Sequence, residues 1–466
     1  MRSETGLAES LASSCNRDGF CISSLVPSGA TRPRYGEQAL LAPHHHRVMT
    51  RSSPLWPLLA GFAITILQLT MAVALLAPQG PVSNRYSTLV QHDSYWFMNI
   101  VDRGYQTIVP PINHKVMEVS NVAFFPAYPV FAALLHYGLN LNTGNALLIT
   151  AQLAAWGFWS YFFLFCRRWN ISPALQFCGA LLILAHPAAF FLVAGYSESL
   201  FLMALLGFIY WSTAQGRHVK IWAALHGIIM SAARIVGIVC AAFPVVRALF
   251  LQGWNALRRP RDWIRQNASA IGLMVVGASG GLAFFVYCEV RWGDWGIYML
   301  TQAAGWGIIP DYLAVFKPSS YHWLLPALND PTEASQMSMT LGALLFLGIA
   351  LFELLVGLRR PSLPRPVETH GETEWATRFG IYFCALVIYY LSVSGVACVD
   401  MESMLRYEFC AHALIVLAVL NFLRQFHTPP MLVRVFGIAA VALFTAAGLS
   451  VQGWYVWNFT RGNWVA

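Results

Sequence analysis

Long apolar runs alternate with short polar segments along most of the chain. From Pro54 onward these runs are about 20 residues long, the length that crosses the ~30 Å hydrocarbon core of a bilayer as an α-helix. The predicted spans are 55–77, 145–166, 173–194, 198–214, 268–290, 336–358, 376–397, 405–424 and 432–452. The pattern therefore predicts an all-α, polytopic membrane protein.

Two further apolar segments allow more than one topology. The segment 124–139 is short for a span and rich in proline and aromatic residues, whereas 220–251 is too long for one span and carries Arg234 near its middle. In the first topology, 124–139 lies flat in the outer interface, and 220–250 forms two short spans that meet near Arg234. In the second, 124–139 crosses the membrane and 220–250 is a single span. Either arrangement totals about eleven spans.

The distribution of basic residues favours the first topology, because cytoplasmic loops of membrane proteins carry an excess of Lys and Arg. The first topology places a large group of basic residues inside: Arg167, Arg168, Arg217, Lys220, Arg258, Arg259, Arg261, Arg265, Arg359, Arg360, Arg424 and Arg434. The second would move Arg167, Arg168, Arg217 and Lys220 outside. We therefore expect the first topology.

The polar segments divide the chain into three parts. Residues 1–53 predict a disordered cytoplasmic tail, since a cleaved signal peptide would begin within the first ~30 residues. Residues 54–250 form a first module with the outer loop 79–144. Residues 251–466 form a C-terminal transmembrane region, whose outer loop covers 291–335.

The composition excludes an ordinary water-soluble domain. The chain is 57% hydrophobic and 11% charged, against ~25% charged in soluble domains. In so apolar a chain, the net charge of +8 indicates membrane orientation and no nucleic-acid partner. The nine cysteines form no CxxC pair, and most lie in apolar runs as small core residues. The tripeptide His44–His46 could bind a metal ion, but an unstructured tail is the simpler interpretation.

The segment 92–105 carries the first candidate for chemistry. Its apolar residues recur every three or four positions, which predicts an amphipathic helix that Gly104 ends and that begins near Asp93. Asp93 is either an N-cap or a general base, and the positive end of the helix suits both roles. Asp102 lies about two and a half turns further and faces the opposite side.

Other ionisable residues stand near the predicted outer ends of spans. Glu118 precedes a Pro- and aromatic-rich turn that contains Phe125 and Tyr128, and Glu198 follows Tyr196 at the head of a span. Such groups are either dipole-favoured first-turn acids or functional residues.

Two arginines are the strongest candidates to bind a phosphate. Arg234 needs an anionic partner within an apolar stretch, and either Glu198, Asp93 or a bound phosphate would provide one. Arg406 is a second phosphate candidate, with a local ion pair to Asp400 or Glu402 as the alternative. Taken together, the residues predict an outer-face site for a lipid phosphate.

The order of these motifs resembles the PIG-V family, the second mannosyltransferase of GPI-anchor synthesis and its bacterial relatives, within the GT-C glycosyltransferase superfamily. The resemblance covers roughly residues 55–250. The motifs that occur there in one order are His92-Asp93, Gly104-Tyr105, Phe124-Phe125-Pro126 with Tyr128-Pro129, Pro187 through Tyr196-Ser197-Glu198-Ser199-Leu200-Phe201, and Ala233-Arg234 with Gly237. The later half resembles the family in hydropathy and at Arg406-Tyr407. Family members commonly have Trp where this chain has His92, so contacts at that position are expected to differ.

The resemblance implies a GT-C-like bundle and an inverting transfer of mannose or a related sugar from a polyprenyl-phosphate carrier. By this resemblance Asp93 acts as the base, Arg234 or Arg406 stabilises the leaving phosphate, and His92, Tyr105, Glu118, Phe125, Tyr128, Tyr196 and Glu198 are candidates to bind substrate. The implied partners are the lipid-linked donor, a glycolipid or other hydroxyl acceptor, and membrane lipids. No cofactor is predicted. The first outer loop has no clear DxD sequence, so no metal ligands are assigned, and the sequence leaves the dependence on a divalent metal open.

The expected location is a bacterial plasma membrane or the endoplasmic reticulum membrane of a eukaryote, with the N-terminus in the cytoplasm. A transporter or flippase for a lipid or amphiphile is the alternative function. Its binding groups are expected near the bilayer midplane and in broken helices of related halves. The polar groups singled out here lie instead at outer helix ends.

Overall fold

The structure is a computed structural model, and it describes residues 55–107, 120–253, 258–322, 331–359, 371–426 and 431–465. The predicted tail 1–53, His44–His46 and Glu118 lie outside these residues. The α-helices, in chain order, are α1 (Trp56–Thr70), α2 (Val82–Ser87), α3 (Asp93–Arg103), α4 (Ala127–Leu139), α5 (Thr143–Arg168), α6 (Pro173–Leu184), α7 (Glu198–Ser212), α8 (Val219–Ala233), α9 (Val236–Cys240), α10 (Phe243–Gln252), α12 (Pro260–Gln266), α13 (Ala268–Trp292), α14 (Ile297–Trp306), α15 (Pro331–Arg359), α16 (Gly371–Val396), α17 (Met404–Leu423) and α18 (Met431–Phe459).

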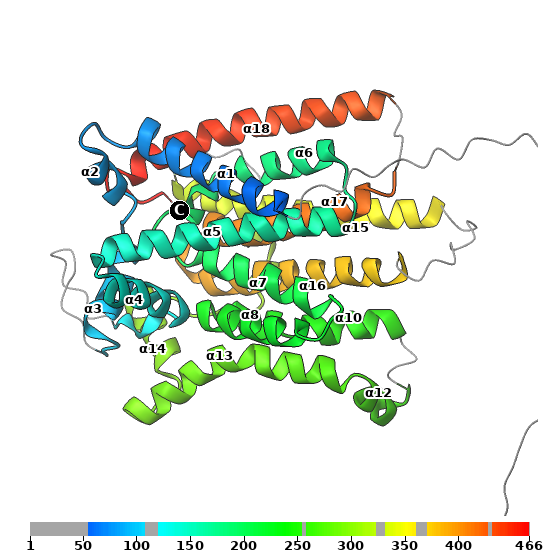
Figure 1. Ribbon diagram of the computed structural model, residues 1–466, viewed down its shortest axis with the longest axis horizontal. Helices are drawn as coiled ribbons and strands as arrows, with labels where there is room; N and C mark the ends of the chain where they lie inside the picture. The colour runs from blue at the N-terminus through cyan, green and yellow to red at the C-terminus, as the bar shows by residue number, and fades with distance from the viewer. Residues whose placement is uncertain are drawn as a thin grey trace, which may run out of the picture. The chain divides into compact units, whose positions relative to one another are not determined.

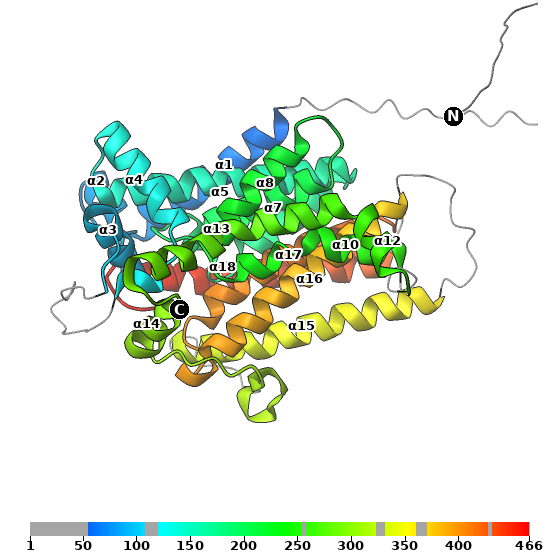
Figure 2. The ribbon, with the colours of Figure 1, turned by 90° about the horizontal axis from the view of Figure 1, so that it is seen from below.

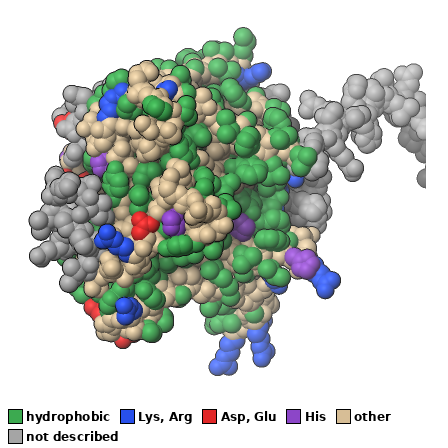
Figure 3. Space-filling model, turned by 60° about the vertical axis from the view of Figure 1, so that its left-hand side comes forward, with side chains coloured by type: hydrophobic (Ala, Val, Ile, Leu, Met, Phe, Trp, Pro, Cys, Tyr) green, Lys and Arg blue, Asp and Glu red, His purple; other side chains and the backbone are tan. Residues whose placement is uncertain are grey.

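The all-α, polytopic class is confirmed, since the described residues contain helices and turns but no strand. Seven helical segments are long and apolar enough to cross a membrane: Trp56–Leu76, Thr143–Arg168, Ala268–Trp292, Glu333–Val356, Glu374–Val399, Met404–Leu423 and Met431–Phe459. Five shorter apolar helices accompany them: Ala127–Leu139, Pro173–Leu184, Glu198–Ser212, Val219–Ala233 and Val236–Gln252. Large hydrophobic areas also remain on the surface that Figure 3 shows, as expected for a chain surrounded by lipid.

The segment 220–250 breaks at Arg234, as the first topology predicts. Helix α8 ends at Ala233, Arg234 is extended (φ −154°, ψ 145°), and α9 begins at Val236. Gly237 permits the tight turn, because a Cβ atom there would lie 2.4 Å from the carbonyl oxygen of Met230. The break directs the arginine side chain to the end of the bundle where α7 begins.

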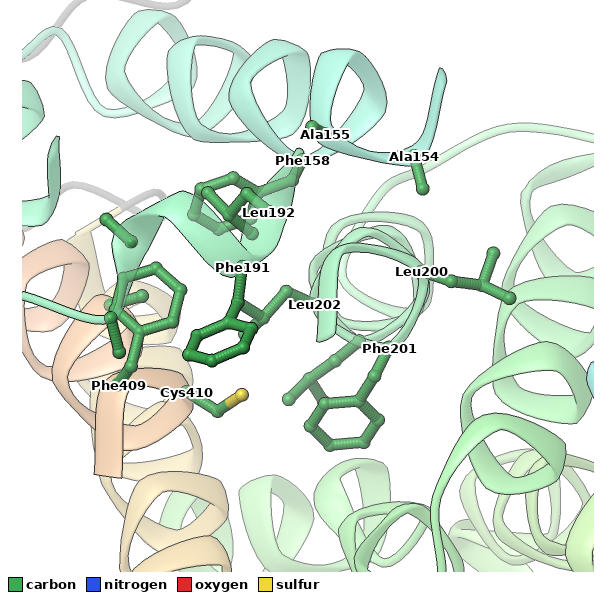
Figure 4. Close-up of a cluster of buried hydrophobic side chains, with 14 of the residues drawn as sticks. Ala154, Ala155, Phe158, Phe191, Leu192, Leu200, Phe201, Leu202, Phe409 and Cys410 are labelled. Atoms are coloured by element: carbon green, nitrogen blue, oxygen red, sulfur yellow. The ribbon is translucent and has the colours of Figure 1, made fainter. Parts of the chain in front are cut away.

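The prediction of one continuous span over 173–194 is wrong. Helix α6 ends at Leu184, because Pro187 has no N–H group to continue the helix and its ring restricts the preceding backbone. The following segment, with a short 3₁₀ turn at Ala189–Leu192, is buried among α5, α7 and α17, where Figure 4 shows Phe191 and Leu192.

Side chains from other helices satisfy the backbone of this buried segment. Gln68 of α1 donates to the Ala189 carbonyl at 3.1 Å. Gln452 of α18 donates to the carbonyls of Leu184 and His186, at 3.0 and 2.7 Å. Irregular backbone at membrane depth requires such internal partners, so these two glutamines hold the segment that leads to Tyr196.

Helix α4 lies across the direction of α5 at one end of the bundle (Figures 1 and 2). Its 13 residues extend about 20 Å, less than the ~30 Å of a hydrocarbon core. Length and orientation agree with the prediction of a helix that lies flat. Helices α3 and α14 and the C-terminus lie at the same end, which we call the site end, and α12 lies at the opposite end.

Glycines bring α8 and α13 into close backbone contact. A Cβ atom at Gly227 would lie 2.7 Å from the Gly277 Cα, and one at Gly280 would lie 2.1 Å from the Ile228 carbonyl oxygen. Ser231 of α8 donates to the Gly277 carbonyl at 2.7 Å and accepts from the Gly281 N–H at 3.0 Å. Small residues and interhelical hydrogen bonds of this kind hold membrane helices together. This packing fixes the end of α8 from which Arg234 extends.

Candidate functional site

The base candidate, Asp93, is the first residue of α3. The interpretation of Asp93 as the N-cap is wrong, because the N-cap residue is His92, whose side chain makes no cap hydrogen bond. His92 has a left-handed φ of 50°, a conformation that costs a non-glycine residue of order 1–3 kcal/mol. The backbone turn at His92 leaves the Asp93 carboxylate directed at another helix.

Asp93 pairs with Arg406, the third residue of α17. The Arg406 Nη1 lies 2.6 Å from the Asp93 Oδ2, and its Nε lies 3.3 Å from the Glu198 Oε1. The Nη1 of Arg234 donates to the same Glu198 oxygen at 2.8 Å. The prediction that Glu198 or Asp93 neutralises Arg234 is therefore confirmed for Glu198, whereas the local pairing of Arg406 with Asp400 or Glu402 is wrong.

These four residues, Asp93, Glu198, Arg234 and Arg406, form the charged cluster. Two carboxylates balance two guanidinium groups, so the charged cluster has no net charge when all four are ionised. Glu198 is 1% exposed and Arg406 is 5% exposed, a degree of burial that ionised groups tolerate only when they are paired. The second oxygen of Glu198 is buried and accepts no hydrogen bond from the described residues.

Aromatic rings surround the two arginines. The guanidinium carbon of Arg406 lies 5.1 Å from the ring centres of both Tyr196 and Tyr407, and that of Arg234 lies 4.8 Å from the ring centre of Tyr407. The Nη2 of Arg406 also donates to the Tyr407 hydroxyl at 3.2 Å. These contacts add cation–π attraction and keep both arginines in place.

The charged cluster lies where two cavities meet. The first, which we call the apolar cavity, has a volume of about 540 Å³, and aliphatic and aromatic side chains of α9, α13 and α14 form much of its wall. Asp93, Glu198, Arg234 and Arg406 line its charged end. Asp93 and Arg406, together with Tyr407, also line the second cavity.

The second cavity, which we call the polar cavity, has a volume of about 600 Å³. Three tryptophans, Trp96, Trp306 and Trp464, contribute to its wall, and the rings of Trp96 and Trp306 lie 5.5 Å apart, edge to face. Glu402, in the turn before α17, adds a carboxylate.

Two titratable groups of the polar cavity have shifted pKa values. Burial lowers the pKa of His92 despite opposing contributions from the Asn463 backbone and Asp93, so the ring is neutral at pH 7. Partial burial raises the pKa of Glu402, and the negative charge of Asp93 raises it further, while Arg406 opposes the shift. Both pKa shifts favour the neutral form of the side chain, because desolvation in this cavity penalises a charge of either sign.

The structure brings together most, but not all, of the candidate site residues. Asp93, His92, Phe125, Tyr196, Glu198, Arg234 and Arg406 line one or both cavities. Tyr105 and Tyr128 line neither: their hydroxyls donate to the carbonyls of Phe124 and Leu147, both at 2.8 Å, and their rings pack in the core. Both tyrosines therefore lie outside the two cavities. Asp102 accepts from the Thr143 hydroxyl at 2.5 Å, away from Asp93.

Several site residues are not apparent from the sequence alone. Gln302, Trp306, Glu402 and Trp464 come from the later half of the chain, where the sequence has no short motif to mark them. The signal that was available for Glu402 is its position four residues before Arg406, at the head of a predicted span.

A second group of buried ionisable residues lies deeper in the bundle. Ligand atoms of His186, Glu408 and His412 lie within 4.8 Å of one another. However, the Nδ1 of His186 accepts the Ala188 N–H at 3.2 Å, so its Nε2 carries the hydrogen that is donated to Glu408 at 2.8 Å. With its Nδ1 facing the Ala188 N–H, the His186 ring has no lone pair directed at the centre of the cluster. His186 and Glu408 therefore form a hydrogen-bonded pair, and the Nε2 of His412 lies 3.1 Å from the Leu182 carbonyl oxygen, so the three residues are not a formed metal site.

Comparison with models of protein families and with curated protein sequences finds no match. Among solved structures, the chain is similar to the archaeal oligosaccharyltransferase AglB from Archaeoglobus fulgidus in complex with an inhibitory peptide and a dolichol-phosphate, with a TM-score of 0.46 and 11% identity over 86% of this chain. It is also similar to the Archaeoglobus fulgidus oligosaccharyltransferase tethered with an acceptor peptide, with a TM-score of 0.40 and 12% identity over 87% of this chain. The chain spans 56% and 55% of the length of these two proteins.

Proposed function

We propose that this protein is an integral-membrane glycosyltransferase that takes a sugar from a lipid phosphate and transfers it to a hydroxyl acceptor. The observation that carries the proposal is the position of Asp93, at the junction of an apolar and a polar cavity and in contact with a buried arginine. A transferase of this type must bring a lipid-linked donor and a polar acceptor to one reaction centre. The two cavities provide separate space for each.

The donor is assigned to the apolar cavity. Its aliphatic and aromatic walls suit a polyprenyl chain, and Arg234 and Arg406 lie at its charged end. Guanidinium groups bind phosphate oxygens through paired hydrogen bonds. A bound phosphate would take over part of the role that the Glu198 and Asp93 carboxylates have in the structure described here.

The proposed reaction is a direct displacement with inversion at the anomeric carbon. Asp93 accepts the proton of the acceptor hydroxyl, and the acceptor oxygen bonds to the anomeric carbon. The bond from that carbon to the phosphate oxygen breaks, and its electron pair stays on the lipid phosphate. Arg234 and Arg406 stabilise the charge that develops on this leaving group.

The sequence resemblance to the PIG-V family supports mannose as the sugar and a polyprenyl phosphate as the carrier. It also supports a reaction on the non-cytoplasmic face, either of a plasma membrane or of the endoplasmic reticulum. These finer assignments rest on the motifs around Asp93, Glu198 and Arg234.

The test is transfer of labelled sugar by membranes that contain the Asp93→Asn variant. Membranes receive labelled polyprenyl-phosphate sugars, and mass spectrometry identifies the labelled product. Because asparagine cannot accept the proton, we expect transfer to fall by at least about 10²-fold while the protein remains in the membrane. The control is Asp102→Asn, which changes a carboxylate of the same helix outside the cavities and should keep most of the activity. Wild-type turnover by Asp93→Asn would exclude this residue as the base.

The alternative function, a transporter or flippase, predicts movement of a solute or lipid without a covalent product. Counterflow in liposomes that contain the purified protein measures this directly. The charged cluster favours the enzyme, because its two carboxylates and two arginines lie at helix ends beside a polar cavity.

A further inference from the structure

The wall of the polar cavity carries one more negative side chain than positive side chains: Asp93 and Glu402 against Arg406. The charged cluster sums to zero, since Asp93 and Glu198 offset Arg234 and Arg406. Glu402 stands outside it: among the described residues, no Lys, Arg or His side chain forms an ion pair with Glu402. Glu402 is an exposed residue, and its carboxylate is the excess negative charge at the wall of this cavity.

An unusual turn places Glu402 in the cavity. Asp400, Met401 and Ser403 have left-handed φ values of 52°, 60° and 66°. The Met401 and Glu402 N–H groups donate to the carbonyls of Val396 and Val399, both at 3.0 Å. Non-glycine residues adopt this conformation only when the surrounding structure imposes it, so the direction of the turn is specified.

The surroundings of Glu402 suit hydrogen-bond donors rather than anions. The titratable groups that share the cavity wall with it are His92, Asp93, Tyr95, Arg406 and Tyr407. His92 is neutral, and Arg406 is already paired with Asp93 and Glu198. Because Arg406 is the cation assigned to the donor phosphate, no further cation of the described wall remains to pair with an anionic acceptor. The aromatic side chains of Trp96, Trp306 and Trp464 also belong to this wall, and aromatic rings suit contact with a sugar ring.

We propose that Glu402 determines acceptor specificity: it accepts hydrogen bonds from hydroxyl or amino groups beside the reacting hydroxyl and excludes acceptors with a negative charge there. The inference rests on the proposed function for its assignment of the polar cavity to the acceptor. The acceptor class that follows is an uncharged or positively charged glycoside. Glu402 positions this ligand, and Asp93 remains the group that takes the proton.

The test measures binding without any donor, so that it does not depend on turnover. The full chain in phosphatidylcholine nanodiscs is titrated with methyl β-glucoside, its 2-amino analogue and methyl β-glucuronide, which share one ring and differ in charge. Quenching of tryptophan fluorescence reports binding, because three tryptophans line the cavity. For the wild type we expect the glucuronide to bind at least about tenfold more weakly than the glucoside.

The Glu402→Gln variant should lose most of this discrimination, because the amide keeps the shape of the side chain without its charge. Glu289→Gln is the matched control: it removes one negative charge from α13, outside both cavities, and should discriminate as the wild type does. Discrimination that persists unchanged in Glu402→Gln overturns the proposal. So does a wild type that binds all three glycosides equally, or none of them.

A second measurement uses the wild type alone, in case the variant does not fold. Desolvation and the charge of Asp93 raise the pKa of Glu402, so as pH falls its carboxylate is protonated before the carboxyl group of the glucuronide is. The preference for the glucoside should therefore weaken over this range, and a preference independent of pH contradicts the proposal.

The two proposals can fail separately. Discrimination that depends on Glu402, in a chain that transfers no sugar, removes only the glycosyltransferase assignment. Sugar transfer by a chain whose discrimination does not depend on Glu402 removes only the specificity assignment.

Discussion

At the scale of single residues, the site depends on one buried oxygen atom. The Oε1 of Glu198 lies 2.8 Å from the Nη1 of Arg234 and 3.3 Å from the Nε of Arg406. Both guanidinium groups come from segments distant from Glu198 in sequence, so this carboxylate joins α7, the α8–α9 break and α17. Loss of its charge leaves Arg406 with Asp93 alone and leaves the partly buried Arg234 without an ion-pair partner among the described residues.

The Glu198→Gln substitution should therefore destabilise the protein. Removing one partner of a buried ion pair costs about 3–5 kcal/mol, because the other charge stays buried without compensation. A clear fall in the thermal unfolding midpoint of the purified protein in detergent is the expected result.

The control for this substitution is Asp311→Asn, which breaks an exposed pair with Lys317. Lys317 lowers the pKa of Asp311, so this small contribution is present above the usual carboxyl pKa and is lost as pH falls. Exposed pairs are screened by water, and the midpoint should change far less. Equal shifts for the two variants would contradict the buried role of Glu198.

At the scale of helices, the position of Arg234 depends on the contact between α8 and α13. The glycines of α13 let the two backbones touch, and Ser231 bridges them. A displacement of α8 away from α13 would move the α8–α9 break and, with it, the arginine that lines the apolar cavity.

Gly280→Ala tests this contact. The added methyl group would lie 2.1 Å from the Ile228 carbonyl oxygen, so the helices must separate, and we expect a loss of about 1–3 kcal/mol in stability. Gly272→Ala is the matched control on the same helix, because a Cβ atom there meets nothing within 4 Å and alanine favours a helix. The measurement is the thermal unfolding midpoint of each variant. A midpoint for Gly280→Ala at or above that of Gly272→Ala would contradict the close packing of α8 and α13.

At the scale of the whole molecule, the charged cluster and the basic helix α12 lie at opposite ends of the bundle. The positive-inside rule assigns the basic end to the cytoplasm, so the site end is expected on the other side. The Asp311 N–H donates to the Ser394 carbonyl near the C-terminal end of α16, and this contact places the segment of Lys317 at the site end. Arg261 lies in α12, at the opposite end.

Cysteine labelling tests this orientation. In a cysteine-free background, a maleimide that does not cross membranes should label Lys317→Cys on intact cells or sealed vesicles of native orientation. It should label Arg261→Cys only after the membrane is opened. The reverse pattern would place the site on the cytoplasmic side and would contradict the topology.

The sequence by itself determined the elements and the ionisable residues that matter. Apolar runs gave most of the long helices, because a bilayer penalises polar groups over a fixed thickness. The cost of an unpaired arginine identified Arg234 and its need for Glu198. The hydropathy pattern gave a wrong prediction for 173–194, because Pro187 ends the helix inside an apolar run and hydropathy does not report where a helix ends.

Only the tertiary structure decided which groups meet. Arg406 could have paired with Asp400 or Glu402 in its own turn, but it reaches Asp93, 313 positions away in sequence. Tyr105 and Tyr128 belong to motifs that resemble those of the family, yet packing directs them into the core. The two cavities and the tryptophans of the polar cavity arise from segments that no local pattern connects. Contacts between distant segments depend on how whole helices pack, and local periodicity carries no information about that packing.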